Sequence, residues 1–413
     1  MLTRRNAFKA AAGLAATATV GTAGVANAAD KVIKIGLNMS FTGADAESAV
    51  RVANAAIMAF DDANSTGAIK GYKFEYVKFD DGTATAGQYD PAQAATNARK
   101  MVSDKTFVAA LGPQMSGAGK AMAPILSAGN LATITPSSTN PDITDPKFAA
   151  QYKPAGKAIY FRTVATDAFQ GPNMANYMAE TLKVKSIFIL DDSGAYGVGL
   201  ADAFQAQAEK RGIKILGRDR LDPKATDYAA ILTKVKSLNP DALYYGGVGQ
   251  AGVKVVKQAY DILPKMIKAG GDGIYGSDIL KGAGFPAVEG WYATNASPHV
   301  TEDPKAAKFS AAFYKRFNMY PQDYSATCYV GAQVIIAAVK TVVASGKPVT
   351  RDAVRDAIGG IKLADSLIGP VEFDDNGDVK NKVISVFQVR QAKDKAQDDP
   401  DSQFKYVGIA PMA

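Results

Sequence analysis

The strongest constraint on the fold of this chain is an alternation of strand-like and helix-like segments that begins near residue 31. Short β-branched runs such as KVIKIGLNM (31–39) and FVAALGP (107–113) are separated by amphipathic stretches. The stretch 46–67 places Val52 and Phe60 on one helical face, as a buried helix requires. This order of elements predicts a parallel sheet with helices on both of its faces.

The alternation restarts near Ala158 and predicts a second unit of similar size. AIYFRTV (158–164), SIFILDD (186–192), DALYYGG (241–247) and GIYGSD (273–278) are its expected strands. A chain of 413 residues exceeds one ordinary domain, so the sequence predicts an α/β protein with two doubly wound lobes. No linker rich in Pro, Gly or Ser separates the units, which favours a hinge of several strands.

The expected division of the chain gives each lobe two segments. Residues 29–160 plus 295–385 form the first lobe, and residues 161–294 plus 386–413 form the second. Residues 1–28 join a basic head to a mildly apolar stretch and end in ANA, which predicts a cleavable export signal cut after about Ala28. Arg4 and Arg5 resemble a twin-arginine signal, although Phe8 stands one place late, so the Sec route stays open. We therefore expect a periplasmic protein.

Small polar residues follow several of the expected strands. Ser116 comes after FVAALGP, Ser137 and Thr139 come after LATITP, Tyr196 follows SIFILDD, and Asp278 ends GIYGSD. Ligands of open parallel sheets bind outside the carboxyl ends of the strands. A serine at a helix N-terminus suits a carboxylate, and an aspartate suits an ammonium. The pattern predicts two lobes that close over a small zwitterion, although each residue alone could be a turn former or a solvated side chain.

The composition argues against several other classes of function. The chain carries 47 Lys and Arg against 40 Asp and Glu with no dense basic run, so nucleic-acid binding has little support. A single histidine, His299, and a single cysteine, Cys328, make a metal site improbable, and we expect no metal and no cofactor. Ser116 lacks the two flanking glycines of a hydrolase nucleophile, and Cys328 is expected to be a buried structural thiol.

A rival hypothesis of another class comes from the stretch GGVGQAG. Gly247, Gly249 and Gly252 satisfy the dinucleotide fingerprint between a strand and a helix, and Asp272 follows at the spacing of its ribose-binding acid. This pattern would make the chain an exported nicotinamide-dependent oxidoreductase. The fingerprint ordinarily opens the first strand–helix turn of its domain, whereas here it sits late in the second unit.

The motifs IKIGLNMSFTG, LGPQMSG, TITPSSTNP, FRTVATDAFQGP and DDSGAYGVGLA occur in the order found in a known family. Across essentially the whole mature chain, the sequence resembles the leucine/isoleucine/valine-binding branch of the periplasmic solute-binding proteins that serve ABC importers. The resemblance implies the type I periplasmic binding fold and capture of a branched-chain or aliphatic amino acid without catalysis. It also implies a monomer that delivers its ligand to membrane permease subunits.

The resemblance also implies roles for individual residues. Ser116 would hold the ligand carboxylate, Ser137 and Thr139 the ammonium and carboxylate, and Asp278 the ammonium. Tyr196 would cover the ligand from the second lobe, and Tyr324 would form an aromatic wall.

The sequence departs from the family pattern at several pocket positions. A residue close to Ser48 replaces an aromatic one, Val248 replaces a tyrosine, and Met115 replaces a cysteine. These departures keep an alternative ligand open, namely an aromatic or aliphatic carboxylate that lacks the amine.

Overall fold

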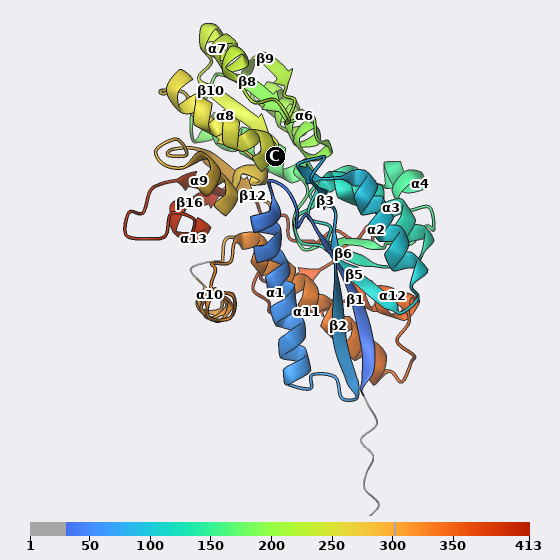
Figure 1. Cartoon of the computed structure of the whole chain (residues 1–413). Helices are drawn as coiled ribbons and strands as arrows, with labels where there is room; N and C mark the ends of the chain where they lie inside the picture. Colours follow the sequence, from blue (N-terminus) through green and yellow to red (C-terminus); the bar gives the residue numbers. More distant parts are fainter. Residues whose placement is uncertain (1–29, 301–302) are drawn as a thin grey trace, which may run out of the picture.

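The computed structural model describes residues 30–300 and 303–413, and two sheets form the cores of two lobes (Figure 1). The five-stranded sheet of the first lobe has the order β2-β1-β5-β6-β7. The seven-stranded sheet of the second lobe has the order β16-β15-β12-β11-β10-β8-β9. The predicted α/β class with two doubly wound lobes is thereby confirmed, whereas the predicted export signal lies outside the described residues.

The first lobe is a parallel sheet between two layers of helices. Its strands are β1 (Lys31–Met39), β2 (Tyr72–Asp80), β5 (Phe107–Leu111), β6 (Thr133–Thr135) and β7 (Tyr160–Arg162). Its main helices are α1 (Ala46–Ser65), α2 (Pro91–Ser103), α3 (Ser116–Ala128), α11 (Asp323–Ala344) and α12 (Arg351–Gly359). Helices α1 and α11 share one hydrophobic cluster and α2 and α3 another, because the alternating residues of β1 point to opposite faces.

The second lobe adds two antiparallel edge strands to a parallel sheet. Its strands are β8 (Ser186–Asp191), β9 (Lys214–Arg220), β10 (Ala242–Gly246), β11 (Ile267–Gly270), β12 (Tyr292–Asn295), β15 (Ser385–Val389) and β16 (Phe404–Ile409). Its helices are α5 (Asp167–Glu180), α6 (Ala195–Lys210), α7 (Ala229–Leu238), α8 (Gly249–Ile262) and α9 (Ser277–Ala283).

One predicted strand of the second lobe is wrong. Residues 273–278 do not form a strand: Asp272–Ile274 is a 3-10 turn, and α9 begins at Ser277. The strand lies just upstream, where the segment Ile267–Gly270 pairs with β10. Glycines at 271, 273 and 276 interrupt any extended apolar run there, so the chain turns back over the end of the sheet.

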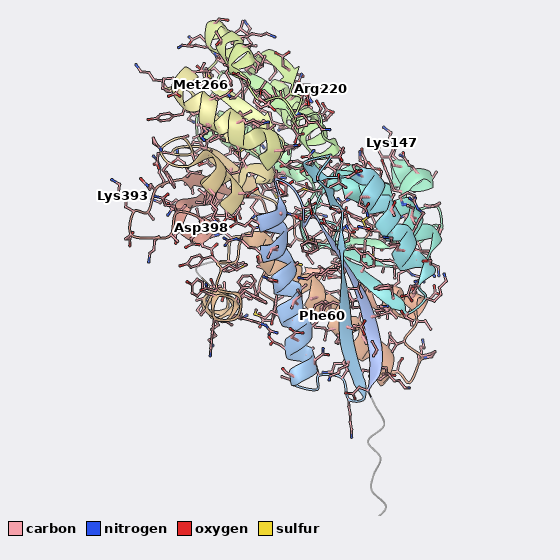
Figure 2. All side chains as sticks on the ribbon, in the orientation of Figure 1. Phe60, Lys147, Arg220, Met266, Lys393 and Asp398 are labelled. Atoms are coloured by element: carbon pink, nitrogen blue, oxygen red, sulfur yellow. The ribbon has the colours of Figure 1, made fainter. Side chains whose placement is uncertain are left out.

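Smaller elements complete the lobes. They are β3 (Gly82–Thr83), β4 (Gln88–Tyr89), α4 (Ala149–Tyr152), α10 (Pro304–Phe317), β13 (Lys362–Leu363), β14 (Val371–Glu372), α13 (Pro400–Gln403) and 3-10 turns at Pro141–Ile143 and Pro146–Phe148. Phe60 of α1, labelled in Figure 2, packs on Phe74 of β2 with 5.3 Å between the ring centroids.

The chain passes between the lobes after β7, after β12 and before β15. Two of these passages run side by side, since the Ala165 N–H donates to the Ala296 carbonyl at 2.8 Å. The predicted divisions at 160/161, 294/295 and 385/386 fall within β7, β12 and β15. The lobe boundaries themselves stay a prediction.

Several contacts join the lobes away from these passages. The Lys281 ammonium on α9 lies 2.7 Å from Glu47 on α1, and the Asn140 amide donates to the Ala195 carbonyl at 3.0 Å. Asp398, labelled in Figure 2 before α13, lies 3.1 Å from the Arg51 guanidinium of α1. The structure is therefore of the closed arrangement, with the two lobes in contact.

Candidate functional site

The carboxyl ends of strands from both sheets meet at one cavity between the lobes. Its atom-free space, open mouth included, is about 490 Å³. The predicted site residues that line it are Ser116, Ser137, Tyr196, Asp278 and Tyr324. The positions that depart from the family pattern, Ser48, Met115 and Val248, also line it, as do Asp45, Gln114 and Asp272, which the sequence did not assign to ligand binding.

Ser116 begins helix α3 at the first-lobe wall of the cavity. Met115 precedes it without a side-chain cap, so the backbone N–H groups of the first helical turn keep no partner within the helix. The Ser116 hydroxyl oxygen accepts a hydrogen bond from the Asn140 N–H at 3.2 Å, which leaves its own proton available to donate. Helix dipole, amides and hydroxyl together suit an anionic group.

The hydroxyl groups after β6 point in three different directions. The Ser137 hydroxyl donates to the Gln114 carbonyl at 2.9 Å, so it presents lone pairs to the cavity. The Ser138 hydroxyl accepts from the Tyr160 hydroxyl at 2.9 Å. Thr139 departs from the prediction: its hydroxyl donates to the buried Asp167 at 3.0 Å, and its side chain does not line the cavity. A buried carboxyl group needs such donors, and Asp167 takes this one.

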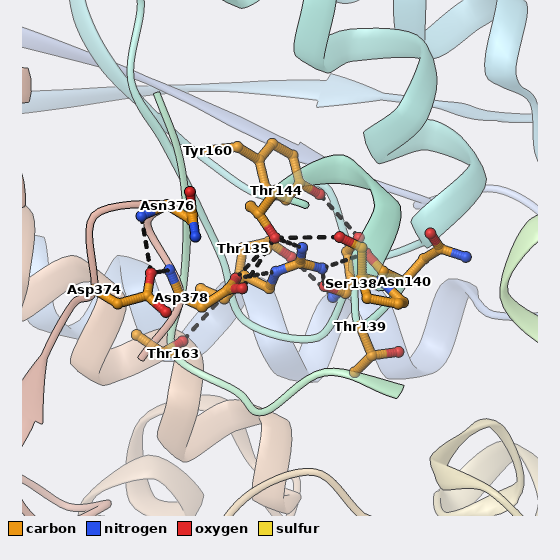
Figure 3. Close-up of polar contacts among 12 residues, drawn as sticks. Thr135, Ser138, Thr139, Asn140, Thr144, Tyr160, Thr163, Asp374, Asn376 and Asp378 are labelled. Atoms are coloured by element: carbon orange, nitrogen blue, oxygen red, sulfur yellow. Dashed lines mark hydrogen bonds and ion pairs between the residues drawn. The ribbon is translucent and has the colours of Figure 1, made fainter. Parts of the chain in front are cut away.

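Arg162 fixes the loop that carries these hydroxyl groups. Its guanidinium is fully buried and donates to the carbonyls of Ser138 at 3.0 Å and Asn140 at 2.7 Å. Arg162 Nε also lies 2.7 Å from Asp378 Oδ1, and Figure 3 labels Ser138, Asn140 and Asp378 in this polar network. Burial alone would raise the pKa of Asp378, but the charge of Arg162 holds that pKa below its usual value. This ion pair and the two carbonyl contacts form a charged clamp that holds the loop after β6.

Asp272 is a lining residue that sequence reasoning associated only with the dinucleotide fingerprint. It lies in the 3-10 turn after β11, and its carboxylate accepts hydrogen bonds from the hydroxyl groups of Tyr196 and Tyr324. Its backbone N–H donates to Gln170 Oε1 at 3.0 Å. Burial raises the pKa of Asp272 above its ordinary value. Both Asp272 and Asp278 follow the end of β11, so their positions in the sequence could not show which of the two contacts a ligand.

Two further carboxylates converge on the cavity, one from each lobe. Asp278 lies in the first turn of α9, and Asp45 lies directly before α1 of the other lobe. A Cβ added at Gly249 would lie 2.9 Å from Asp278 Oδ2 and 3.5 Å from Asp45 Oδ1, so both carboxylates reach the same point. Burial raises the pKa of Asp278 to about 6. Burial, and then the charge of Asp278, raise the pKa of Asp45 to about 8.

Residues 32–396 match the family model described as periplasmic binding protein. The chain belongs to the periplasmic binding protein family. It is 30% identical over 376 residues to the Leu/Ile/Val-binding protein homolog 3 of Brucella melitensis biotype 1, which covers 91% of this chain and 96% of that protein. It is 30% identical over 379 residues to a leucine-, isoleucine-, valine-, threonine- and alanine-binding protein of Pseudomonas aeruginosa, covering 91% and 94%.

Solved structures share the fold of this periplasmic binding protein. A leucine binding protein from Thermotoga maritima superposes with a TM-score of 0.78 at 22% identity, over 92% of this chain and 98% of that one. An ABC transporter solute binding protein from R. palustris, solved with benzoate, gives a TM-score of 0.75 at 18% identity, over 92% and 97%. The expected resemblance and the type I periplasmic binding fold are confirmed.

The dinucleotide hypothesis does not fit this periplasmic binding protein. Helix α8 begins at Gly249, where a bound pyrophosphate would have to meet the helix N-terminus. The carboxylates of Asp45 and Asp278 surround that point and would repel phosphate groups. Asp272 lies in a turn against two tyrosine hydroxyls, in contrast to the ribose-binding acid of a dinucleotide site.

The remaining sequence expectations concern single residues of the binding protein. Cys328 is a buried free thiol on α11, as expected. His299 stacks on Tyr406 with 4.5 Å between ring centroids and does not line the cavity of Ser116.

Proposed function

We propose that this periplasmic binding protein captures a small amino acid between its two lobes and delivers it unchanged to the permease subunits of an ABC importer. The observation that carries the proposal is the polarity of the cavity. One wall presents hydrogen-bond donors at the start of α3, and the facing wall presents carboxylates. A zwitterion matches that arrangement, and the names of the relatives make aliphatic amino acids the first ligands to test.

The ligand carboxylate binds at the start of α3 in this proposal. The Ser116 hydroxyl and the N–H groups of the first turn donate to it. A Cβ added at Gly117 would lie 2.5 Å from the Tyr89 ring. A residue larger than glycine would therefore clash there unless the Tyr89 ring or the start of α3 moved. The role of Ser116 is the one expected from the sequence.

The ligand ammonium binds between the loop after β6 and Asp272. Ser137 presents acceptor lone pairs there, and Asp272 supplies the opposite charge. We assign the α-ammonium to Asp272, whereas the sequence favoured Asp278, because hydrogen bonds tie Asp272 to the loop. Gln170 bonds both Asp272, at 3.0 Å, and Asp167, at 2.8 Å, and Asp167 bonds Thr139.

The two tyrosines that hold Asp272 also cover the ligand. Tyr196 comes from α6 of the second lobe and Tyr324 from α11 of the first, so both are in place only when the lobes are closed. Met115 and Val248 supply apolar surface for the ligand side chain. Closure then removes the ligand from water, and the closed form is the one presented to the permease.

An amine-free carboxylate is the second candidate ligand. The solved relative with benzoate shows that this fold can hold such an acid in another protein. Here it would leave the buried Asp272 without a cationic partner, which costs free energy. We further propose a monomer, export with cleavage after about Ala28, no catalysis, and the lobe division expected from the sequence.

Thermal-shift screening of the mature protein tests this proposal. The panel is the common amino acids together with deaminated acids, in particular leucine beside 4-methylpentanoate. A ligand present at 100 times its Kd adds about 2.7 kcal/mol to the free energy of unfolding. We expect stabilisation by at least one amino acid, and a smaller stabilisation by its deaminated analogue. Stabilisation by benzoate or 4-methylpentanoate alone would contradict the amino-acid assignment.

A further inference from the structure

The end of the cavity next to α1 contains hydrogen-bond acceptors that lack donors. Within residues 30–300 and 303–413, Asp45 Oδ2 and Gln114 Oε1 are buried and accept no hydrogen bond. Both residues line the cavity, and they are only 2% and 6% exposed. A buried acceptor without a donor is costly, so a ligand atom is the natural partner for each of them.

Ser48 accounts for the orientation of this group. Its hydroxyl oxygen receives the side-chain N–H groups of Gln114 at 3.1 Å and Gln322 at 2.6 Å. Each amide therefore turns its carbonyl oxygen away from Ser48, and Gln322 Oε1 is likewise without a donor among the described residues. A Cβ added at Gly276 would lie 2.6 Å from Asp278 Oδ1 and 3.5 Å from Gln322 Oε1, which places this oxygen beside the Asp278 carboxylate.

The charges around this group do not balance. Asp45 and Asp278 face each other from opposite lobes, and the further carboxylates of Asp192 and Asp81 act on Asp45 from the ends of β8 and β2. No Lys, Arg or His is among the described residues that line the cavity. The nearby cations Arg51 and Lys281 are paired outside it, each with Glu47 at 2.7 Å.

We propose that this acceptor-rich end, formed by Asp45, Asp278 and Gln114, binds a cationic N–H donor at the far end of the ligand side chain. The ligand is then an amino acid with a second ammonium or a guanidinium group. This inference rests on the proposed function, because Ser116 and Asp272 still hold the α-carboxylate and α-ammonium. Among amino acids, the inference therefore favours those with a cationic side chain over those with a purely aliphatic one.

A cationic group bound between Asp45 and Asp278 also stabilises the closed arrangement of the lobes. Two carboxylates that approach each other from opposite lobes repel unless a cation or a proton lies between them. Burial and the charge of Asp278 raise the pKa of Asp45, which favours a proton there when the site is empty. A bound ammonium replaces this proton and joins the lobes. Binding of such a ligand therefore releases about one proton.

The test compares ligands that differ only in the terminal group. Ornithine and norleucine have side chains of the same length and shape, ending in an ammonium and a methyl group respectively. The pairs diaminobutyrate with norvaline and lysine with 2-aminoheptanoate extend the comparison to shorter and longer chains. Calorimetric titration of the mature protein gives each Kd, and repetition in buffers of different ionisation enthalpy counts the protons released.

We expect at least one diamino acid to bind roughly tenfold or more tightly than its methyl-ended partner, with proton release. Asp45→Asn should abolish this ratio, with the loss of affinity falling on the diamino acid. Asp261→Asn is the matched control, because Asp261 is an exposed aspartate on α8 that does not line the cavity, and it should keep the ratio.

The outcomes separate this inference from the proposed function. Tighter binding of the methyl-ended ligands, or a ratio that survives in Asp45→Asn, overturns the inference while amino-acid capture stands. A divalent cation that binds alone, with no diamino acid bound, also overturns it. If no amino acid of either series, and none of the common amino acids, binds, the proposed function itself fails.

Discussion

The Tyr324 hydroxyl donates a hydrogen bond to Asp272 across the boundary between the lobes. Tyr324 lies on α11, which packs against the first sheet, and Asp272 follows β11 of the second sheet. Both residues line the cavity, so the same bond joins the lobes and forms one wall of the proposed ligand site. Closure and ligand binding therefore share residues, which couples the two events.

Tyr324→Phe removes this bond without changing the shape of the aromatic wall. Asp272 then loses one of its two tyrosine donors, and the closed arrangement loses a charge-assisted contact between the lobes. We expect affinity for the amino-acid ligand to fall roughly tenfold. Calorimetry gives the Kd, and small-angle scattering should show a smaller share of closed protein at the same ligand concentration. An unchanged Kd would show that this hydrogen bond does not couple closure to ligand binding.

Ser116→Ala should weaken every ligand that carries a carboxylate. The variant removes a hydroxyl donor to a charged group while the helix N–H groups remain, so the expected loss is roughly tenfold for amino acids and deaminated acids alike. Ser138→Ala is the control, because its hydroxyl bonds Tyr160 and does not line the cavity. Equal affinities of Ser116→Ala and wild type would place the carboxylate elsewhere.

Asp272→Asn should weaken ligands that carry an α-amine and spare those that lack one. The variant keeps acceptor and donor atoms near Tyr196 and Tyr324 but removes the charge that faces the α-ammonium. Affinity for leucine should fall roughly tenfold to a hundredfold, and affinity for 4-methylpentanoate should stay or rise. Asp278→Ala, measured in parallel, reports the carboxylate that the sequence favoured. If only Asp278→Ala weakens leucine, the assignment of the α-ammonium to Asp272 is refuted.

Arg162→Met tests the charged clamp that holds the loop after β6. It leaves Asp378 without its ion pair and the carbonyls of Ser138 and Asn140 without their donor. Removing one partner of a buried pair costs about 3–5 kcal/mol, so denaturant unfolding should show a loss of that order. The exposed pair Arg316–Asp61 is the control, and Arg316→Met should cost about 1 kcal/mol or less. Similar losses in the two variants would argue against the clamp.

The buried carboxyl groups predict how stability depends on pH. Burial raises the pKa of Asp45 to about 8 and those of Asp81 and Asp192 to about 6. Above about pH 4 the folded protein therefore binds more protons than the unfolded chain, so the free energy of unfolding falls as pH rises toward about 8. Urea titrations of the ligand-free protein check this slope. Asp45→Asn should reduce this slope above about pH 6, where Asp167, whose pKa burial also raises, still contributes, and a slope of opposite sign would contradict the burial of these groups.

Much of the fold followed from local patterns. The amphipathic segment 46–67 became α1 nearly residue for residue, because its apolar face alone decides which side packs on the sheet. The strand expected at 273–278 failed because the glycines there favour turns, and the pairing strand Ile267–Gly270 contains a lysine and a glycine that weaken its sequence signal. Strand order, by contrast, depends on long-range pairing that periodicity does not carry.

The candidate site was predictable by position but not by side-chain direction. Ser116 and Ser137 line the cavity because residues at strand ends of a parallel sheet share one edge. Thr139 stands two places after Ser137, yet it serves Asp167, which is distant in the sequence. Asp45 escaped notice because a single aspartate before a helix ordinarily caps it, and here the side chain makes no capping bond.

A crystal structure of the mature protein with its tightest amino-acid ligand tests the central claim most directly. We expect one molecule in the cavity between the lobes, with its α-carboxylate on the Ser116 hydroxyl and the first turn of α3, and its α-ammonium on Asp272. A ligand bound outside this cavity, or one whose carboxylate lies against Asp272, would contradict the account.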